Sequence, residues 1–285
     1  MTPVHTAPKA SGNAGPTAPS RRRAAAASGL RLFALAACSV IGVTVWAEAP
    51  DPRDPYKSYA WIDMHKAFLH GAAVRFDERV KVQGPSFAED PMNVPISVEV
   101  SPELGPVDRV LVLVDRNPIR QVLEYQPLQA LPAIGFRFKL EQASPVRAAV
   151  RLRDGSWVVG STWVDSTGGG CTVSGATRKD GSWSRTLGEV SGRVFQRSAS
   201  AADSARLRVQ IMHPMDTGLV AGVPAFYVNR LSVRDAQGTE LARMLTWEPV
   251  SENPVFSFDF PRPLAGGVQL VGTDNNGNRI TSRVQ

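Results

Sequence analysis

Alternation of apolar and polar residues at period two recurs along much of the chain and predicts β-strands. Residues 94–100 (Val-Pro-Ile-Ser-Val-Glu-Val) alternate strictly, as a strand with one buried face does. Residues 110–114 (Val-Leu-Val-Leu-Val) are apolar throughout and predict a strand buried in the core. An Asp-Gly pair separates the strand patterns of residues 146–152 and 157–159, which predicts a hairpin.

A second series of strand patterns begins at residue 205 and runs to the end of the chain. Between the two series, residues 186–204 are rich in Ser and Ala and predict a linker. Many short strands separated by turn residues are typical of sandwiches and barrels, so we expect an all-β chain of two domains. The one substantial helix expected covers residues 61–69. The strands of the second series are expected at residues 205–211, 226–233, 241–247, 255–260, 267–271 and 279–284.

The first 47 residues are typical of an export signal. Three arginines at residues 21–23 precede an apolar segment at residues 32–46, which is short for a bilayer span. The arginine run and the long polar start favour the twin-arginine route into the periplasm. Two alternatives stay open: cleavage and lipidation at Cys38, or retention of the segment as a single-span anchor. Contact with a membrane is expected only through such a retained signal or lipid anchor.

The net charge of +6 suggests an acidic partner until its distribution is considered. Five of the 32 basic residues lie in residues 1–47, which contain no Asp or Glu, so the remainder holds 27 basic and 26 acidic residues. Nucleic-acid binding needs concentrated Lys and Arg. The composition therefore argues against a nucleic-acid partner.

The strongest chemical candidate is Cys171, which would be the only cysteine left after removal of the signal. It follows Gly168, Gly169 and Gly170, and Gly175 closes the same loop (residues 165–175, hereafter the cysteine loop). Glycines give a narrow, flexible backbone, so we expect an exposed thiol on an arm that reaches on the order of 20 Å. No basic residue flanks Cys171 directly, so its pKa is expected near the ordinary ~8.5. The alternative is a small buried core residue.

Other catalytic patterns are weak. His65 and His70 are five residues apart, whereas two metal ligands on one helical face are four apart. His213 precedes a proline in a strand-to-turn position. No Cys-x-x-Cys, phosphate-binding loop, dinucleotide fingerprint or serine elbow is present. We expect no catalytic residue, no metal site and no cofactor.

Residues 211–219 (Ile-Met-His-Pro-Met-Asp-Thr-Gly-Leu) closely resemble a signature of SoxZ, a subunit of the bacterial sulfur-oxidation system. This resemblance implies that His213 is a packing or interface residue. Residues of about 75–175 resemble SoxY, including residues 94–98 and the glycine-flanked Cys171. The whole chain is therefore similar to a fused SoxYZ carrier, of the kind associated with quinoprotein dehydrogenases. On this basis residues 58–185 form a SoxY-like domain, residues 186–204 a linker and residues 205–285 a SoxZ-like domain.

The resemblance implies two immunoglobulin-like sandwiches and a sulfur intermediate, such as one derived from thiosulfate, held covalently on Cys171. Its implied partners are periplasmic sulfur-oxidation enzymes or cytochromes, or a quinoprotein dehydrogenase system, with no turnover by the chain itself. In the family pattern the cysteine lies in a terminal Gly-Gly-Cys-Gly-Gly tail. Here Thr172 and Val173 follow the cysteine and the arm is internal. Two other hypotheses stay open: a non-covalent accessory module and a cysteine-dependent enzyme.

Overall fold

A computed structural model describes residue 51, residues 53–199 and residues 202–285. The expected signal segment and Cys38 lie outside the described residues. All described residues belong to one compact unit. Within the described part of the chain, none of the helices has the length and apolar character needed to cross a membrane.

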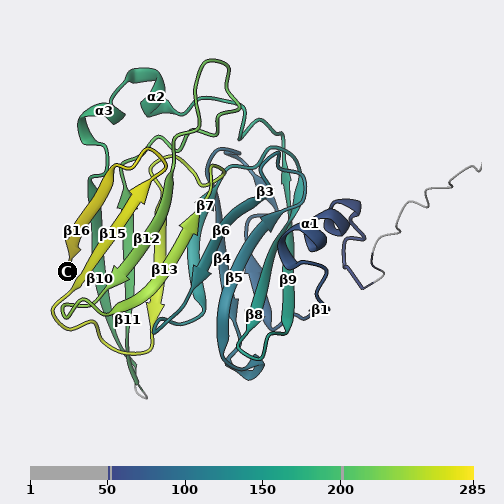
Figure 1. Cartoon of the computed structure of the whole chain (residues 1–285), viewed down its shortest axis with the longest axis horizontal. Coiled ribbons are helices and arrows are strands. Elements are labelled where there is room, and N and C mark those ends of the chain that lie inside the picture. Colours follow the sequence, from purple (N-terminus) through teal and green to yellow (C-terminus); the bar gives the residue numbers. More distant parts are fainter. Residues whose placement is uncertain (1–50, 52, 200–201) are drawn as a thin grey trace, which may run out of the picture. The chain divides into compact units, whose positions relative to one another are not determined.

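Two β-sheets packed face to face make up this unit (Figure 1). The first sheet has ten strands in the order β1-β9-β8-β5-β6-β13-β12-β15-β16, with β3 paired to β9. The second has six, in the order β10-β11-β14-β7-β4-β2. The strands of the N-terminal half (residues 53–166) are β1 (Val74–Phe76), β2 (Val80–Gln83), β3 (Phe87–Ala88), β4 (Val94–Val100), β5 (Val107–Val114), β6 (Gln121–Gln126), β7 (Ala133–Phe138), β8 (Ser144–Leu152) and β9 (Trp157–Ser166). Those of the C-terminal half (residues 190–285) are β10 (Val190–Ala199), β11 (Ala202–Ile211), β12 (Val228–Arg234), β13 (Glu240–Thr246), β14 (Val255–Phe260), β15 (Val268–Asp274) and β16 (Arg279–Val284).

The expected fold class, two immunoglobulin-like β-sandwiches, is confirmed, and several elements have the predicted bounds. Strand β4 alternates buried and exposed residues along its whole length, because its inner face packs into the core and its outer face meets solvent. Residues 110–114 of β5 are all buried, as their continuous apolar pattern predicted. Strands β8 and β9 pair antiparallel around the Asp-Gly turn, which confirms the hairpin.

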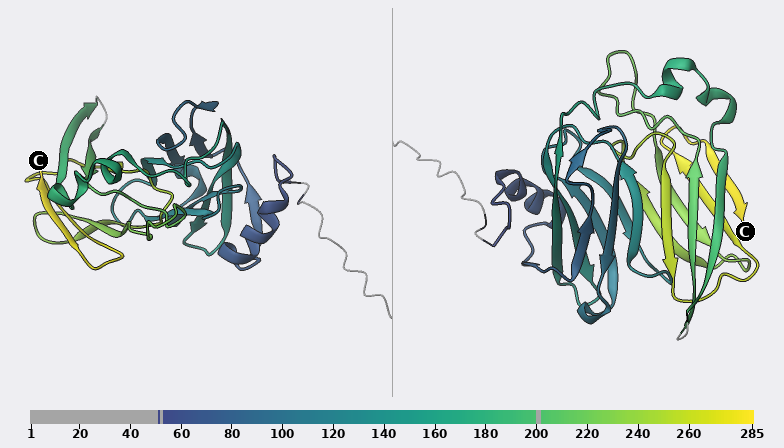
Figure 2. Two further views of the ribbon diagram at one scale, coloured as in Figure 1. Left: turned by 90° about the horizontal axis from the view of Figure 1, so that it is seen from above. Right: turned by 180° about the vertical axis from the view of Figure 1, so that it is seen from behind.

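The two halves are joined by hydrogen-bonded strands rather than by a linker. At the seam β6 pairs with β13 and β7 pairs with β14, so both sheets run through both halves, as Figure 2 shows. The cores are continuous as well: the rings of Tyr125 and Phe258, one from each half, lie 5.9 Å apart between centroids. The prediction of a linker at residues 186–204 was wrong, since most of this interval belongs to the hairpin β10–β11. Its Ser- and Ala-rich composition conceals strands that are held by backbone pairing.

Helix α1 (Tyr59–Leu69) matches the predicted helix and covers the outer face of the ten-stranded sheet (Figure 1). Its buried residues Trp61, Met64 and Leu69 form a second apolar cluster with side chains of β5, β8 and β9. The segment before α1 is fixed by Arg147 on β8, whose guanidinium pairs with Asp54 and Asp115 at 2.7 Å. All three side chains are fully buried.

The connection between the halves contains two short helices, α2 (Ala176–Asp180) and α3 (Trp183–Thr186). Both lie beyond the strand ends in Figure 1, at the same end of the unit as the cysteine loop. A 3₁₀ turn, η1 (Pro102–Leu104), lies between β4 and β5. The cysteine loop and α2 therefore lead from the last strand of one half to the first strand of the other.

Candidate functional site

Cys171 lies at the seam between the halves and is buried. Its side chain is 1 % exposed, and its Sγ donates to the carbonyl oxygen of Lys139 at 3.6 Å. The prediction of an exposed thiol was therefore wrong for this structure. The next two residues, Thr172 and Val173, are exposed, so the thiol lies directly beneath the surface. The cysteine loop itself therefore shields the thiol from solvent.

The glycines before Cys171 allow this close docking. A Cβ on Gly170 would lie 2.2 Å from the carbonyl oxygen of Pro91 and 2.6 Å from that of Leu140. Gly168 and Gly169 have φ of +93° and +85°, a region that side chains disfavour. The predicted role of these glycines as a flexible arm is thus only part of their function, because they also permit backbone-to-backbone contact.

Glu141 holds the cysteine loop through its carboxylate. Its Oε2 accepts the Cys171 N–H at 2.8 Å, and its Oε1 accepts the Thr172 hydroxyl at 3.0 Å. The backbone of Glu141 also accepts the Gly169 N–H at 3.2 Å. Hydrogen bonds to a charged acceptor are the stronger ones in proteins. Glu141 is therefore the principal anchor that the N-terminal half provides.

The C-terminal half supplies the second anchor. The hydroxyl of Thr217 donates to the Cys171 carbonyl oxygen at 2.6 Å and is buried with it. Thr217 belongs to the segment of residues 211–219 singled out in the sequence, which here follows β11. Each half of the chain thus forms a hydrogen bond with the backbone of Cys171.

Asn117 positions the segment that carries Glu141. Its side chain is buried, donates to the Lys139 carbonyl oxygen at 2.7 Å and accepts the Glu141 N–H at 2.8 Å. A buried amide that uses both of its ends in this way fixes the local backbone. The turn before β6 therefore sets the position of both groups that contact Cys171 from the N-terminal half.

Lys139 contacts the thiol directly, because its carbonyl oxygen accepts from Cys171 Sγ. This residue was not predicted from the sequence. It is 4 % exposed, and its ammonium donates to the Met215 carbonyl oxygen across the seam. Burial lowers the pKa of Lys139 to about 8, against the raising effect of Cys171 and of three carboxylates, Asp216, Glu252 and Glu248. The one sequence signal was a lysine between two apolar residues, directly after the last residue of β7.

The electrostatics of the docked site suppress the thiolate. Burial raises the pKa of Cys171 to about 12, and the Glu141 carboxylate adds to the rise while the Lys139 ammonium opposes it. The nucleophilic form of cysteine is the thiolate. The docked thiol is consequently protonated and unreactive at neutral pH.

The far end of the cysteine loop is fixed to the C-terminal half. The Glu252 carboxylate accepts the backbone N–H groups of Ala176 and Thr177 at 2.8 and 2.6 Å. Arg178 pairs with the buried Asp216 and lies 4.4 Å from the ring of Trp183. Helix α2 is thus anchored independently of Cys171.

His213 packs in the core, as the sequence predicted. It is 1 % exposed, its ring centroid lies 4.4 Å from that of Phe226, and its Nδ1 accepts the Met215 N–H at 3.1 Å. Nε2 faces Asp274 at 3.5 Å. Through Met215 the histidine supports the turn that carries Thr217, so its contribution to the site is indirect.

The described residues contain no group of three or more His, Cys, Asp and Glu side chains that could hold a metal ion. His65 and His70, considered from the sequence, both lie at α1, and His65 Nε2 donates to the Ala72 carbonyl oxygen. These histidines are separate from the cysteine loop. The site around Cys171 is therefore a thiol held by backbone, hydroxyl and carboxylate groups.

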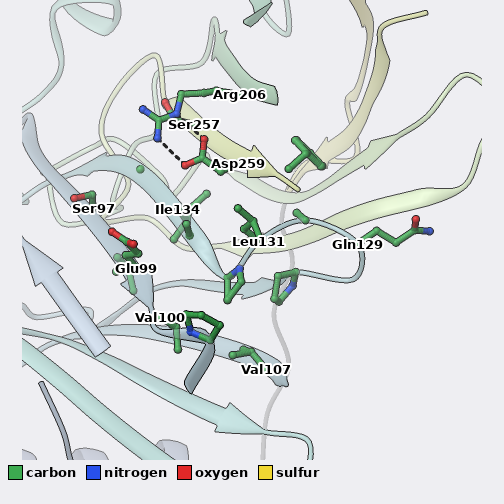
Figure 3. A pocket seen from close by; sticks show the side chains of 18 of the residues that line it. Ser97, Glu99, Val100, Val107, Gln129, Leu131, Ile134, Arg206, Ser257 and Asp259 are labelled. Carbon is green, nitrogen blue, oxygen red and sulfur yellow. Dashed lines mark hydrogen bonds and ion pairs between the residues drawn. The ribbon is translucent and has the colours of Figure 1, made fainter. Parts of the chain in front are cut away.

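A groove of about 1190 Å³ lies at the opposite end of β7, lined by residues of both halves (Figure 3). Leu131 and Ile134 contribute apolar surface, and the ion pair of Arg206 with Asp259 stands at one rim. Because β7 spans six residues at about 3.3 Å each, the groove and Cys171 are roughly 20 Å apart along the strand. The groove is not part of the thiol site.

Comparison with known proteins identifies both halves. The model of the sulfur oxidation protein SoxY matches residues 65–171, and that of the sulphur oxidation protein SoxZ matches residues 193–285. No curated protein sequence matches the chain. Among solved structures, the chain resembles the sulfur carrier protein SoxY from Chlorobium limicola f thiosulfatophilum, with 16% identity and a TM-score of 0.33. That match covers 36% of this chain and 88% of the other.

The assignment rests on the two family models, which together account for most of the described residues. The match to SoxY ends at Cys171, and the match to SoxZ begins within β10. The chain therefore belongs to the SoxYZ family of sulfur-oxidation carrier proteins and joins a SoxY domain and a SoxZ domain in one polypeptide.

Proposed function

We propose that the chain is a periplasmic carrier that holds a sulfur intermediate covalently on Cys171 and presents it to partner enzymes. The observation that carries this proposal is the position of the thiol: it lies on a glycine-rich loop where the SoxY and SoxZ domains meet, and both domains bind the loop. A carrier needs one modifiable group and no catalytic apparatus. The two titratable groups beside the thiol have other partners: Glu141 binds the loop backbone, and the Lys139 ammonium donates to the Met215 carbonyl oxygen.

A carrier of this design works through two positions of the cysteine loop. In the docked position the thiol is buried and its pKa is high, so exchange of sulfur requires undocking. Undocking breaks the bonds to Glu141, Thr217 and Lys139 and leaves the sheets intact. The glycines at residues 168–170 and Gly175 supply the hinges.

The reach of the released thiol is limited because the loop is fixed at both ends. Cys171 lies four residue steps before Gly175, the residue that precedes α2, and each step extends by about 3.3 Å, so Cys171 stays within roughly 13 Å of Gly175 while α2 stays in place. A partner must therefore bring its own active site close to the seam. The partner classes that fit are periplasmic sulfur-oxidation enzymes or cytochromes, including those of a quinoprotein dehydrogenase system.

The test is the intact mass of the protein isolated from the periplasmic fraction of its host. The expected result is a population with added sulfur or oxygenated sulfur on Cys171, removable by thiol reductant and absent from Cys171→Ser. Recovery of the protein from the cytoplasm would contradict the periplasmic assignment. An unmodified Cys171 together with a functional Cys171→Ser variant would instead identify a non-covalent accessory module.

A further inference from the structure

Building on the proposed carrier function, we propose that docking of the cysteine loop reports whether the carrier is loaded. An empty Cys171 docks between the two domains, and a sulfur adduct on Cys171 expels the loop. Partners would then meet two different surfaces at the seam, one for the empty carrier and one for the loaded carrier.

Steric fit is the first support. The Cys171 side chain is 1 % exposed, with its Sγ against the Lys139 carbonyl oxygen. Its amide is fixed by Glu141 and its carbonyl by Thr217, so the residue cannot shift while the loop stays docked. An adduct such as a thiosulfonate replaces the S–H hydrogen by a second sulfur and a sulfonate group. Close-packed interiors do not accommodate such an addition without rearrangement.

Charge is the second support. A thiosulfonate adduct is a permanent anion, and burying an uncompensated charge is costly. The Glu141 carboxylate already binds the Cys171 amide and disfavours negative charge on this residue. The neighbouring cation, Lys139, donates to Met215 and faces three carboxylates. An anionic sulfur group is therefore more stable in solvent than in the docked site.

The anchors of α2 confine the change to a short segment. Glu252 and Arg178 hold α2 through contacts that do not involve Cys171. Residues 168–174 can therefore leave while α2 stays attached to the SoxZ domain. Glu141 comes from the SoxY domain and Thr217 from the SoxZ domain, so the empty state is recognised by both domains at once.

The experiment loads the purified chain in vitro with tetrathionate. The Cys171 thiolate attacks an inner sulfur of tetrathionate, the central S–S bond breaks, and thiosulfate leaves with the electron pair: RS⁻ + S₄O₆²⁻ gives RS–S–SO₃⁻ + S₂O₃²⁻. The thiol is oxidised and tetrathionate is reduced, so no further oxidant is required. The adduct is verified by intact mass, and excess dithiothreitol regenerates the thiol.

The readout is amide hydrogen exchange of the empty, loaded and regenerated protein. Loading is expected to accelerate exchange in residues 168–174 at least tenfold, with residues 176–180 unchanged, and reduction is expected to restore protection. Thr217→Val should accelerate the same segment in the empty protein, whereas the exposed Thr281→Val should not. A loaded protein with unchanged protection would overturn the proposal, as would a thiol that resists tetrathionate in the native protein.

This test is independent of what the host loads. An unmodified Cys171 in protein from the host would contradict the carrier function and leave the exchange result intact. Persistent docking of the tetrathionate-treated protein would contradict only the inference on loading.

Discussion

Glu141 and Cys171 are 30 residues apart in sequence, and the Glu141 Oε2 accepts the Cys171 N–H at 2.8 Å. The same carboxylate accepts the hydroxyl of Thr172. The segment between β7 and β8 thus fixes the cysteine loop, which the sequence predicted to be a flexible arm. Glu141, together with Thr217 on the other half, therefore limits access to the thiol.

Glu141→Gln is expected to increase the rate at which iodoacetamide alkylates Cys171. The amide retains one acceptor oxygen and presents its NH₂ to a neighbouring donor, so one of the two hydrogen bonds is lost. A hydrogen bond to a charged group contributes about 1.5–3 kcal/mol, which corresponds to roughly a 10- to 100-fold higher rate through the open state. Intact mass against time measures the rate.

Glu99→Gln is the matched control, because Glu99 is exposed at the groove at the other end of the unit. Its alkylation rate should equal that of the wild type. Equal rates for all three proteins would show that Glu141 does not govern access to Cys171.

Gly170→Ala should undock the cysteine loop without unfolding the sheets. The new methyl group would overlap the backbone of Pro91 and Leu140, which cannot yield as a side chain could. Alkylation of Cys171 is therefore expected to become faster by more than tenfold, at unchanged far-ultraviolet circular dichroism.

Gly169→Ala separates this overlap from simple backbone strain. Its Cβ meets only Val173 at 4.0 Å, but its φ of +85° costs about 1–2 kcal/mol for a residue with a side chain. It should accelerate alkylation less than Gly170→Ala. The reverse order would contradict the docking geometry.

The strands were predictable because burial of one face of a strand produces alternating apolar and polar residues in the sequence. Residues 94–100 alternate since every second side chain enters the core, and β4 has those same bounds. The helix at residues 61–69 was found within two residues of its true start for a similar reason: its apolar side packs on the sheet. Local patterns of this kind report burial directly.

The joining of the halves could not be predicted in this way. Pairing of β6 with β13 and of β7 with β14 uses backbone groups, which every residue type carries. Strand β10 and the first residues of β11 were predicted to be a linker because the tip of this hairpin is rich in Ser and Ala. Its partly buried Val190 and Val194 do pack on the core, but two residues in a polar segment give a weak signal.

The environment of Cys171 was missed because its contacts are distant in sequence. Glycine, serine and threonine neighbours indicate exposure, but of these only the threonines, such as Thr172, are exposed, and Gly170 is buried. Burial comes instead from Lys139 and Thr217, which are 32 and 46 residues away. The sequence therefore indicates Cys171 as a candidate but not the contacts that control access to its thiol.

His213 should make the protein less stable in mild acid. Burial lowers its pKa to about 4, whereas in the unfolded chain a histidine titrates near ~6.5. Between these values the unfolded state binds more protons, so the free energy of unfolding falls as the pH drops from about 6.5 to 4, by roughly 3 kcal/mol. Above pH 6.5 this contribution is fully present.

His213→Asn tests this assignment by urea unfolding at a series of pH values. The asparagine side chain retains an acceptor for the Met215 N–H but does not titrate. The variant is expected to lose less stability than the wild type between pH 6.5 and 4. Parallel pH profiles would show that other groups cause the acid sensitivity.

Arg147→Met should destabilise the protein strongly, by about 3–5 kcal/mol in urea unfolding. The guanidinium makes two hydrogen bonds to each of Asp54 and Asp115, and none of the three side chains meets solvent. Removal of the arginine leaves two buried carboxylates with neither a counter-charge nor these hydrogen bonds. It also removes the cation that lies 4.8 Å from the Trp61 ring.

Arg151→Met, on the same strand, provides the comparison. Its ion pair with Asp108 is 3.3 Å long and exposed on both sides, so its loss should cost about 0–1 kcal/mol. If the two variants were equally stable, the buried cluster would not be what fixes the segment before α1. A large difference would instead assign that anchoring to Arg147, because length, charge and strand are shared and only burial and pairing differ.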